Sequence, residues 1–201
     1  MLPVDLHQVR TVPLEARANK LEAPAREGVA LAGASGWSEK IVSLDRLLQL
    51  RAGWRKEGRR VVWSNGCFDL LHVGHVRNLR EARGLGHMLV VGVNSDRSVR
   101  QLKGPRRPLV PDYERAEIVA ALEFVDNVVI FNDLTPGPLL HCLKPDIHCK
   151  GGDYAPPHGK PVPEADLIES YGGRVAYLSL TPAISTTDLV RRVRERGGEG
   201  S

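Results

Sequence analysis

The chain has 201 residues, of which 42% are hydrophobic and 26% charged, and it carries a formal net charge of +4 with a sequence pI of about 9.1. This length and composition fit one globular α/β domain and exclude a low-complexity chain. The modest positive charge suits anionic small molecules, and in the absence of a long Lys/Arg block we expect no nucleic-acid partner. No apolar run is long enough to cross a membrane and no secretory signal is recognisable, so we expect a cytoplasmic protein without a membrane partner.

Three cysteines, Cys67, Cys142 and Cys149, occur without CxxC spacing, which is typical of a protein from a reducing compartment. Cys142 and Cys149 each follow a histidine, which raises the alternative of a zinc site. Their spacing matches no common zinc module, and Cys149 falls in an expected strand. We therefore predict no protein-bound metal.

The first 36 residues mix Pro, Ala, Arg and Glu without a sustained period and end in Gly33-Ala34-Ser35-Gly36. We expect residues 1–36 to form a mobile tail and residues 37–198 to form the folded domain.

From Ser43 onward, helical and strand patterns alternate. Strands are expected at residues 60–64, 88–93, 127–131, 146–149 and 175–180. Helices are expected at residues 44–57, 75–83, 113–124, 139–143, 164–171 and 186–196. Strict alternation predicts an α/β fold, a Rossmann-like doubly wound parallel five-stranded sheet flanked by helices. In such folds ligands bind at the carboxyl ends of the strands, near the point where the strand order reverses.

The segment Asn65–His75 follows the first strand and opens the next helix, where a nucleotide phosphate normally meets backbone N–H groups. His72 and His75 are three residues apart, so both imidazoles face the same side of the helix start, where they can donate hydrogen bonds to phosphoryl oxygens. A single histidine there would fit a structural role equally well. Two histidines flanking Gly74 at this point favour a phosphate site.

His72-Val73-Gly74-His75 matches the HxGH signature of the cytidylyltransferase-like nucleotidyltransferase superfamily. Ile184-Ser185-Thr186-Thr187 resembles the ISTT segment that opens the last helix of these enzymes, although the same hydroxyls would also serve as a helix cap. The resemblance spans residues 61–193. It implies the Rossmann-like fold and the joining of a nucleoside triphosphate to a phosphorylated acceptor.

Within that superfamily the chain most resembles the adenylyltransferase branch that acts on heptose 1-phosphate, which is often the C-terminal half of a bifunctional kinase–adenylyltransferase. The resemblance rests on Asn65–Asp69, Val93–Asp96, Leu102–Gly104, Arg107-Pro108 and Lys150–Tyr154. Only a short segment precedes these motifs, so we expect the stand-alone form. His87 and Thr181-Pro182-Ala183 depart from the branch, and the second departure leaves the nucleotide and acceptor preference open.

The resemblance implies that ATP, with Mg²⁺ as cofactor, reacts with D-glycero-β-D-manno-heptose 1-phosphate to give ADP-heptose and pyrophosphate. Implied catalytic residues are His72, His75 and Lys103. Implied nucleotide-binding residues are Gly66, Cys67, Phe68, Gly74, Gly151, Gly152, Asp153, Ser185, Thr186 and Thr187. Implied acceptor-binding residues are Asp69, Asn94, Asp96, Arg107 and Lys150. The implied partners are the two substrates and a second copy of the chain in a homodimer.

Several of these residues also have structural interpretations. From the residues alone, Lys103 fits a surface lysine, Asp69 a cap, and Gly151–Asp153 a capped turn. Two functional alternatives remain. One is a CTP-dependent enzyme that acts on glycerol 3-phosphate or a related alditol phosphate. The other is a non-catalytic regulator that binds nucleotides or nucleic acid.

Overall fold

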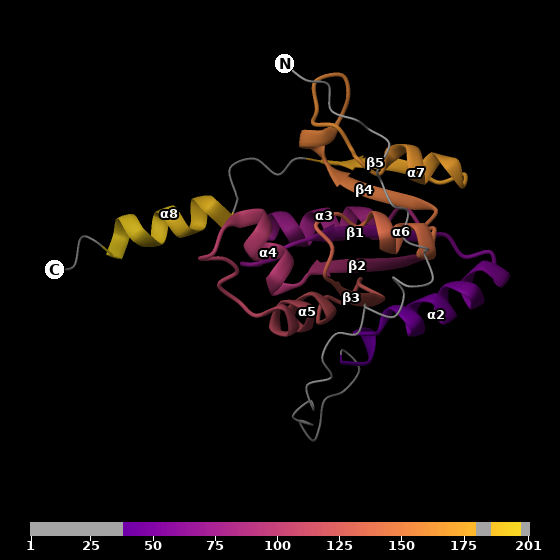
Figure 1. Ribbon diagram of the computed structural model, residues 1–201, viewed down its shortest axis with the longest axis horizontal. Coiled ribbons are helices and arrows are strands. Elements are labelled where there is room, and N and C mark those ends of the chain that lie inside the picture. The colour runs from indigo at the N-terminus through magenta and orange to yellow at the C-terminus, as the bar shows by residue number, and fades with distance from the viewer. Residues whose placement is uncertain (1–37, 180–185, 198–201) are drawn as a thin grey trace, which may run out of the picture. The chain divides into compact units, whose positions relative to one another are not determined.

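Five parallel strands form the centre of the molecule, in the order β3-β2-β1-β4-β5 (Figure 1). The computed structural model describes residues 38–179 and 186–197, so the tail predicted for residues 1–36 lies outside the described residues. The strands are β1 Val61–Gly66, β2 Met88–Asn94, β3 Asn127–Phe131, β4 Ile147–Gly151 and β5 Arg174–Leu178. This order is that of a doubly wound sheet, and the predicted fold class is confirmed.

Helices connect the strands in the expected alternation. The α-helices are α2 Leu44–Lys56, α3 Val73–Arg83, α4 Asp96–Lys103, α5 Asp112–Ala120, α6 Gly137–Leu143, α7 Ala165–Ser170 and α8 Thr186–Gly197, with short 3₁₀ turns η1 Ser38–Lys40 and η2 Gly152–Tyr154. Ser43 caps α2 as expected, since its hydroxyl accepts a hydrogen bond from the Arg46 N–H at 3.2 Å. Among the described residues, no helix has the length and apolar character needed to cross a bilayer.

Two helix assignments differ from the sequence prediction. Helix α4 was not expected, because it has only eight residues, most of them polar, and buries only Ser98 and Val99. The helix expected over 113–124 ends at Ala120. The chain turns there because Asp126 must pair with Leu89, through both its backbone N–H and its carboxylate, to set β3 beside β2.

Each face of the sheet has its own hydrophobic core. Val62, Leu89 and Val91 face α3 and α5, whereas Val61 and Trp63 face α2, α6 and α7. Successive side chains of a strand point to opposite faces of the sheet. Because helices cover both faces, both sets of side chains are apolar and buried. Gly92 is required under the Trp63 ring, since a Cβ at that position would lie 2.4 Å from the ring.

The strand order reverses between β1 and β4, and the two strands separate there. β1 pairs with β2 over six positions, from Val61 to Gly66, but with β4 only through Val62 and Trp63. The loops that follow β1 and β4 therefore leave the sheet at its carboxyl edge without a hydrogen-bonded ladder between them. Doubly wound folds bind their ligands outside the carboxyl ends of the strands, at the point where the strand order reverses.

Candidate active site

The two motif histidines stack on each other at the start of α3. Their ring centroids are 3.8 Å apart with an interplanar angle of 24°, and the Phe68 ring meets His75 edge-on at 5.3 Å. His72 is the N-cap residue in an extended conformation, and His75 is the third residue of the helix. The loop after β1 thus brings both imidazoles to the helix N-terminus at the carboxyl edge of the sheet.

Both imidazoles favour the neutral form at neutral pH. Burial lowers the pKa of His72, and burial together with the neighbouring His72 lowers the pKa of His75 to about 4. The Nδ1 of His75 accepts a hydrogen bond from the His72 backbone N–H at 3.4 Å, so the proton of neutral His75 resides on Nε2. His75 therefore presents an Nε2–H donor, and the buried Nδ1 of His72 has no partner among the described residues.

The loop that carries this pair contains a residue with left-handed backbone. Phe68 has φ of +48°, a conformation that non-glycine residues adopt rarely and that is found at functional sites. Gly66 lies beneath it, and a Cβ there would meet the Phe68 ring at 3.3 Å. Cys67 lies between them and is partly exposed.

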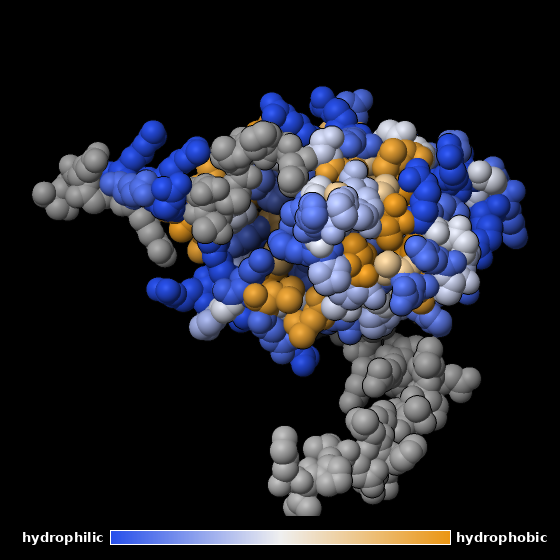
Figure 2. All heavy atoms as spheres, turned by 90° about the horizontal axis from the view of Figure 1, so that it is seen from above, coloured by the Kyte–Doolittle hydropathy of each residue, from blue (hydrophilic) through white to orange (hydrophobic). Residues whose placement is uncertain are grey.

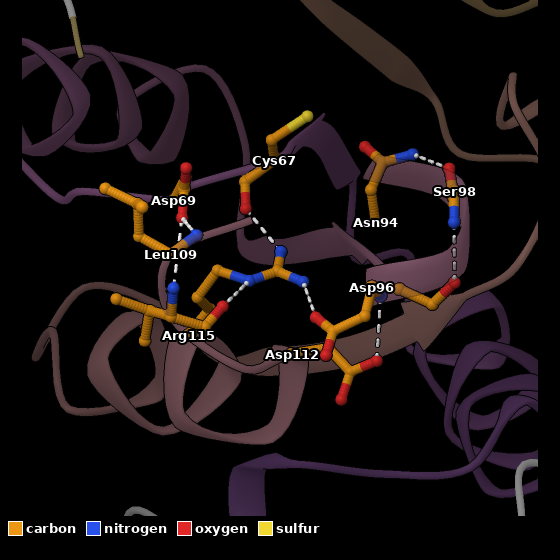
Figure 3. Close-up of polar contacts among 10 residues, drawn as sticks. Cys67, Asp69, Asn94, Asp96, Ser98, Leu109, Asp112 and Arg115 are labelled. Atoms are coloured by element: carbon orange, nitrogen blue, oxygen red, sulfur yellow. Dashed lines mark hydrogen bonds and ion pairs between the residues drawn. The ribbon is translucent and has the colours of Figure 1, made fainter. Parts of the chain in front are cut away.

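A buried arginine, Arg115 of α5, holds this loop in place (Figure 3). Its fully buried side chain donates to the carbonyl oxygens of Cys67 and Val110 and to the carboxylate of Asp96, the last at 2.8 Å. Three separate segments are joined in this way: the loop after β1, the start of α4, and the loop before α5. Planar guanidinium groups suit such multiple acceptors.

Asp69 anchors the loop before α5 from the other side. Its carboxylate accepts hydrogen bonds from the backbone N–H groups of Leu109 and Val110, at 2.6 and 3.2 Å, and pairs with Arg107 at 2.5 Å. Asp69 is buried and all its bonds are to protein. The guanidinium of Arg107, expected to bind the acceptor phosphate, is paired with Asp69 in this structure.

Lys103, the last residue of α4, is exposed beside the same loop. Burial raises the pKa of the Cys67 thiol, and the positive charges of Lys103 and Arg115 oppose that rise, which places both cations near the loop after β1. Asn94 and Asp96, in contrast, face structural partners. The Asn94 amide donates to the Ser98 hydroxyl at 2.9 Å, and the Asp96 N–H donates to Asp112 at 3.0 Å (Figure 3).

The carboxyl end of β4 carries a second polar group. The Lys150 ammonium lies 3.1 Å from the buried carboxylate of Glu164 and 5.4 Å from the centre of the Tyr154 ring. Burial opposes ionisation of Glu164, but His148 and Lys150 outweigh it and bring the pKa to about 2. Fully buried His148, whose Nε2 is 3.8 Å from the same carboxylate, has its pKa lowered by burial.

The glycine segment after β4 folds back over itself. Asp153, in η2, pairs with Lys160 at 2.7 Å, and a Cβ on Gly151 would lie 2.7 Å from the Asp153 carboxylate. That contact is with the far end of an exposed side chain, which can move, and the neighbouring Gly152 begins η2.

Thr186 begins α8, and its hydroxyl lies 3.5 Å from the Leu70 carbonyl oxygen, beside the loop after β1. Ser185 lies outside the described residues, and of Thr187 only its place in α8 is described. Buried Gly74 is the second residue of α3.

The residues of this site offer magnesium no pre-formed set of ligands. Within residues 38–179 and 186–197, no three His, Cys, Asp or Glu side chains gather as a metal site, and the Asp69 carboxylate is fully engaged by protein donors.

Sequence reasoning missed Arg115 and Glu164. For Arg115 a signal exists, because it shares the buried face of α5 with Ala116 and Val119 and is the only charged residue there. A charged residue at a core position of a helix indicates a buried partner. Glu164 gives no such signal, because its role depends on β4 lying beside the start of α7.

Comparison with known proteins agrees with this geometry. Residues 63–192 match the cytidylyltransferase-like family. The chain is 53% identical over 146 residues to "Bifunctional protein HldE" of Syntrophotalea carbinolica, an overlap of 73% of this chain and 29% of that protein. It is 51% identical over 176 residues to the protein of the same name from Pelobacter propionicus, an overlap of 87% and 35%. The chain thus spans about a third of the length of these relatives.

A solved structure supports the same assignment. The lipopolysaccharide core biosynthesis protein from Thermoplasma volcanium is 28% identical, with a TM-score of 0.51 over 63% of this chain and 100% of that one. With the HxGH pair at the reversal of strand order, the chain belongs to the cytidylyltransferase-like family of nucleotidyltransferases.

Proposed function

We propose that the chain transfers an adenylyl group from ATP to D-glycero-β-D-manno-heptose 1-phosphate, with release of pyrophosphate and formation of ADP-heptose. The observation that carries the nucleotidyl transfer is the stacked pair His72 and His75 at the N-terminus of α3. The acceptor rests on the resemblance to the heptose branch, and the bifunctional name of the relatives agrees with that resemblance.

In the proposed reaction, an oxygen of the sugar phosphate attacks the α-phosphorus. The bond from that phosphorus to the bridging oxygen breaks, and pyrophosphate leaves with the electron pair. A phosphate monoester is already largely ionised at pH 7, so the nucleophile needs no general base. Neutral histidines suit this chemistry, because their role is to donate hydrogen bonds to phosphoryl oxygens as charge develops.

The remaining residues take supporting roles in this proposal. Lys103 neutralises phosphate charge, as does the magnesium that arrives with the triphosphate. Backbone groups of Gly66, Cys67 and Phe68, held by Arg115, line the nucleotide. The N-terminus of α8, with Ser185, Thr186 and Thr187, binds the β- and γ-phosphates. These two phosphates leave together as pyrophosphate.

Further roles follow for the residues that were expected to bind substrates. Gly74, Gly151, Gly152 and Asp153 border the nucleotide, and Arg107 contacts the acceptor phosphate by sharing its guanidinium with Asp69. The group Asp69, Asn94, Asp96 and Lys150 acts by shaping the surrounding loops, as their protein partners indicate. We further propose that the enzyme works as a homodimer.

The test is pyrophosphate release with Mg²⁺ from ATP, CTP or GTP against heptose 1-phosphate and glycerol 3-phosphate. Release confined to ATP with heptose 1-phosphate is the expected result. The matched family is described by cytidylyl transfer, which makes CTP with glycerol 3-phosphate the second candidate. Release with that pair would support the same mechanism, with CTP and glycerol 3-phosphate as the substrates. No release from any pair would contradict the proposal.

A further inference from the structure

A cavity lies at the edge of the sheet opposite the histidine pair, at the amino ends of β1 and β4. Its volume is about 490 Å³, and the ends of α2, α6 and α7 border it. β1 runs from this cavity to the active-site loop. At the usual rise per residue of a strand, the cavity and that loop are about 20 Å apart. The amino ends of β1 and β4 and the C-terminal end of α2 lie on the right-hand side of Figure 1. Hydrophilic residues dominate the right-hand end of the view in Figure 2.

The wall of the cavity is strongly cationic. Five basic residues and a single acid line it: Arg51, Arg55, Arg59, Arg60, Lys144 and Asp146. The C-termini of α2, α6 and α7 border the cavity, and basic side chains are favourable beside helix C-termini.

Part of this charge has structural partners. Arg51 is buried, donates to the carbonyl oxygens of Leu143 and Lys144, and pairs with Asp146 at 3.2 Å. The other oxygen of Asp146 accepts a hydrogen bond from the Val61 N–H at 2.6 Å. The single carboxylate is therefore already committed to protein donors and does not neutralise the rest of the wall.

Not all of the remaining basic side chains have a partner of opposite charge. Arg59 pairs with Glu57 at 2.6 Å, whereas the side chains of Arg55, Arg60 and Lys144 have no hydrogen-bond or ion-pair partner among the described residues. Three unpaired like charges around one concave surface raise the local positive potential and attract an anion with more than one charge.

We propose that this cavity binds a small phosphorylated molecule with at least two negative charges. Guanidinium groups bind phosphate oxygens through paired N–H donors, and lysine adds a point charge. The volume lies in the range of small-molecule sites and exceeds what one phosphate fills, so the ligand is larger than inorganic phosphate. The site is separate from the proposed reaction and does not depend on it.

The test uses the full 201-residue chain, isotopically labelled and titrated with inorganic pyrophosphate. Backbone amide shifts of Gly58, Gly172 and Gly173 report on the cavity, and those of Gly74 and His75 report on the active site. We expect saturable shifts at the cavity glycines. Arg55→Gln combined with Arg60→Gln should weaken binding there by about tenfold or more, the loss typical of charge-assisted hydrogen bonds.

A matched control removes the same charge from exposed positions that do not line the cavity. Arg46→Gln with Lys56→Gln, both on α2, should change the cavity affinity by less than about twofold. Equal weakening in the two double variants would mean diffuse surface charge and would overturn the proposal. Absence of a saturable shift at Gly172 and Gly173 would overturn it as well.

Discussion

At the scale of single residues, the proposed chemistry depends on two neutral imidazoles. Replacing His72 or His75 by alanine should lower turnover by about 10²–10³ each, because each removes a donor to developing phosphoryl charge. Pyrophosphate release measures turnover, and urea unfolding checks that the fold is retained. His141→Ala, an exposed histidine on α6, is the control and should be unaffected. Full turnover in either variant contradicts the assignment.

The same residues predict how stability depends on pH. His75 has a folded-state pKa of about 4, well below the usual value of about 6.5 that holds in the unfolded chain. As the pH falls from about 6.5 toward 4, the unfolded chain takes up a proton that folded His75 does not, so stability is lost in this window. The free energy of unfolding, measured with denaturant across pH 4–7, should therefore fall less steeply with decreasing pH in His75→Gln than in the unchanged chain. An unchanged slope would mean that His75 titrates normally.

At the scale of elements, Arg115 connects the loops around the site. Arg115→Lys keeps the charge but cannot reach Cys67, Val110 and Asp96 together. We expect a loss of about 3 kcal/mol in the free energy of unfolding and a raised KM for the nucleotide. Arg97→Lys, at an exposed position of α4, serves as the control. A lower stability with an unchanged KM would show that Arg115 supports the fold but does not position the site.

The packing of the sheet gives a second prediction at this scale. Gly92→Ala on β2 places a Cβ against the Trp63 ring and should cost about 1–3 kcal/mol of unfolding free energy. Gly53→Ala on α2 has open space around its Cβ and should instead stabilise by about 0.5–1 kcal/mol, through helix propensity. Thermal or denaturant unfolding of the pair measures both. Equal effects of the two substitutions would contradict the close approach at Gly92.

At the scale of the whole molecule, a ligand that binds only the folded chain stabilises it. At a hundredfold excess over its Kd, magnesium-ATP should add about 2.7 kcal/mol and raise Tm by roughly 5–10 °C. Lys103→Ala should reduce this shift, because the ammonium is near the loop after β1. Arg97→Ala, an exposed cation on the same helix, should leave it unchanged. Equal shifts in the two variants would remove Lys103 from the nucleotide site.

Regular elements with strong local signals could be predicted from the sequence. The strand at Asn127–Phe131 has the expected bounds, and Ser43 caps α2 as predicted. Helix α4 was missed because it is short and mostly polar, so few apolar residues mark it in the sequence. The residues around the site also divide into those that a local pattern predicts and those that it does not. The spacing of His72 and His75 places them together, but nothing local to Arg107 predicts its pairing with Asp69, 38 residues away in sequence.

The sequence by itself determined the alternating α/β order, the position of the HxGH segment after the first strand, and membership of the family, because these depend on local periodicity and contiguous motifs. Only the tertiary structure decided which polar groups meet. Parallel strand pairing brings together Arg115 with Cys67 and Asp96, Lys150 with Glu164, and the basic residues around the cavity at the amino ends of β1 and β4. Such contacts depend on strand order and burial, which join residues far apart in the chain and leave no local pattern.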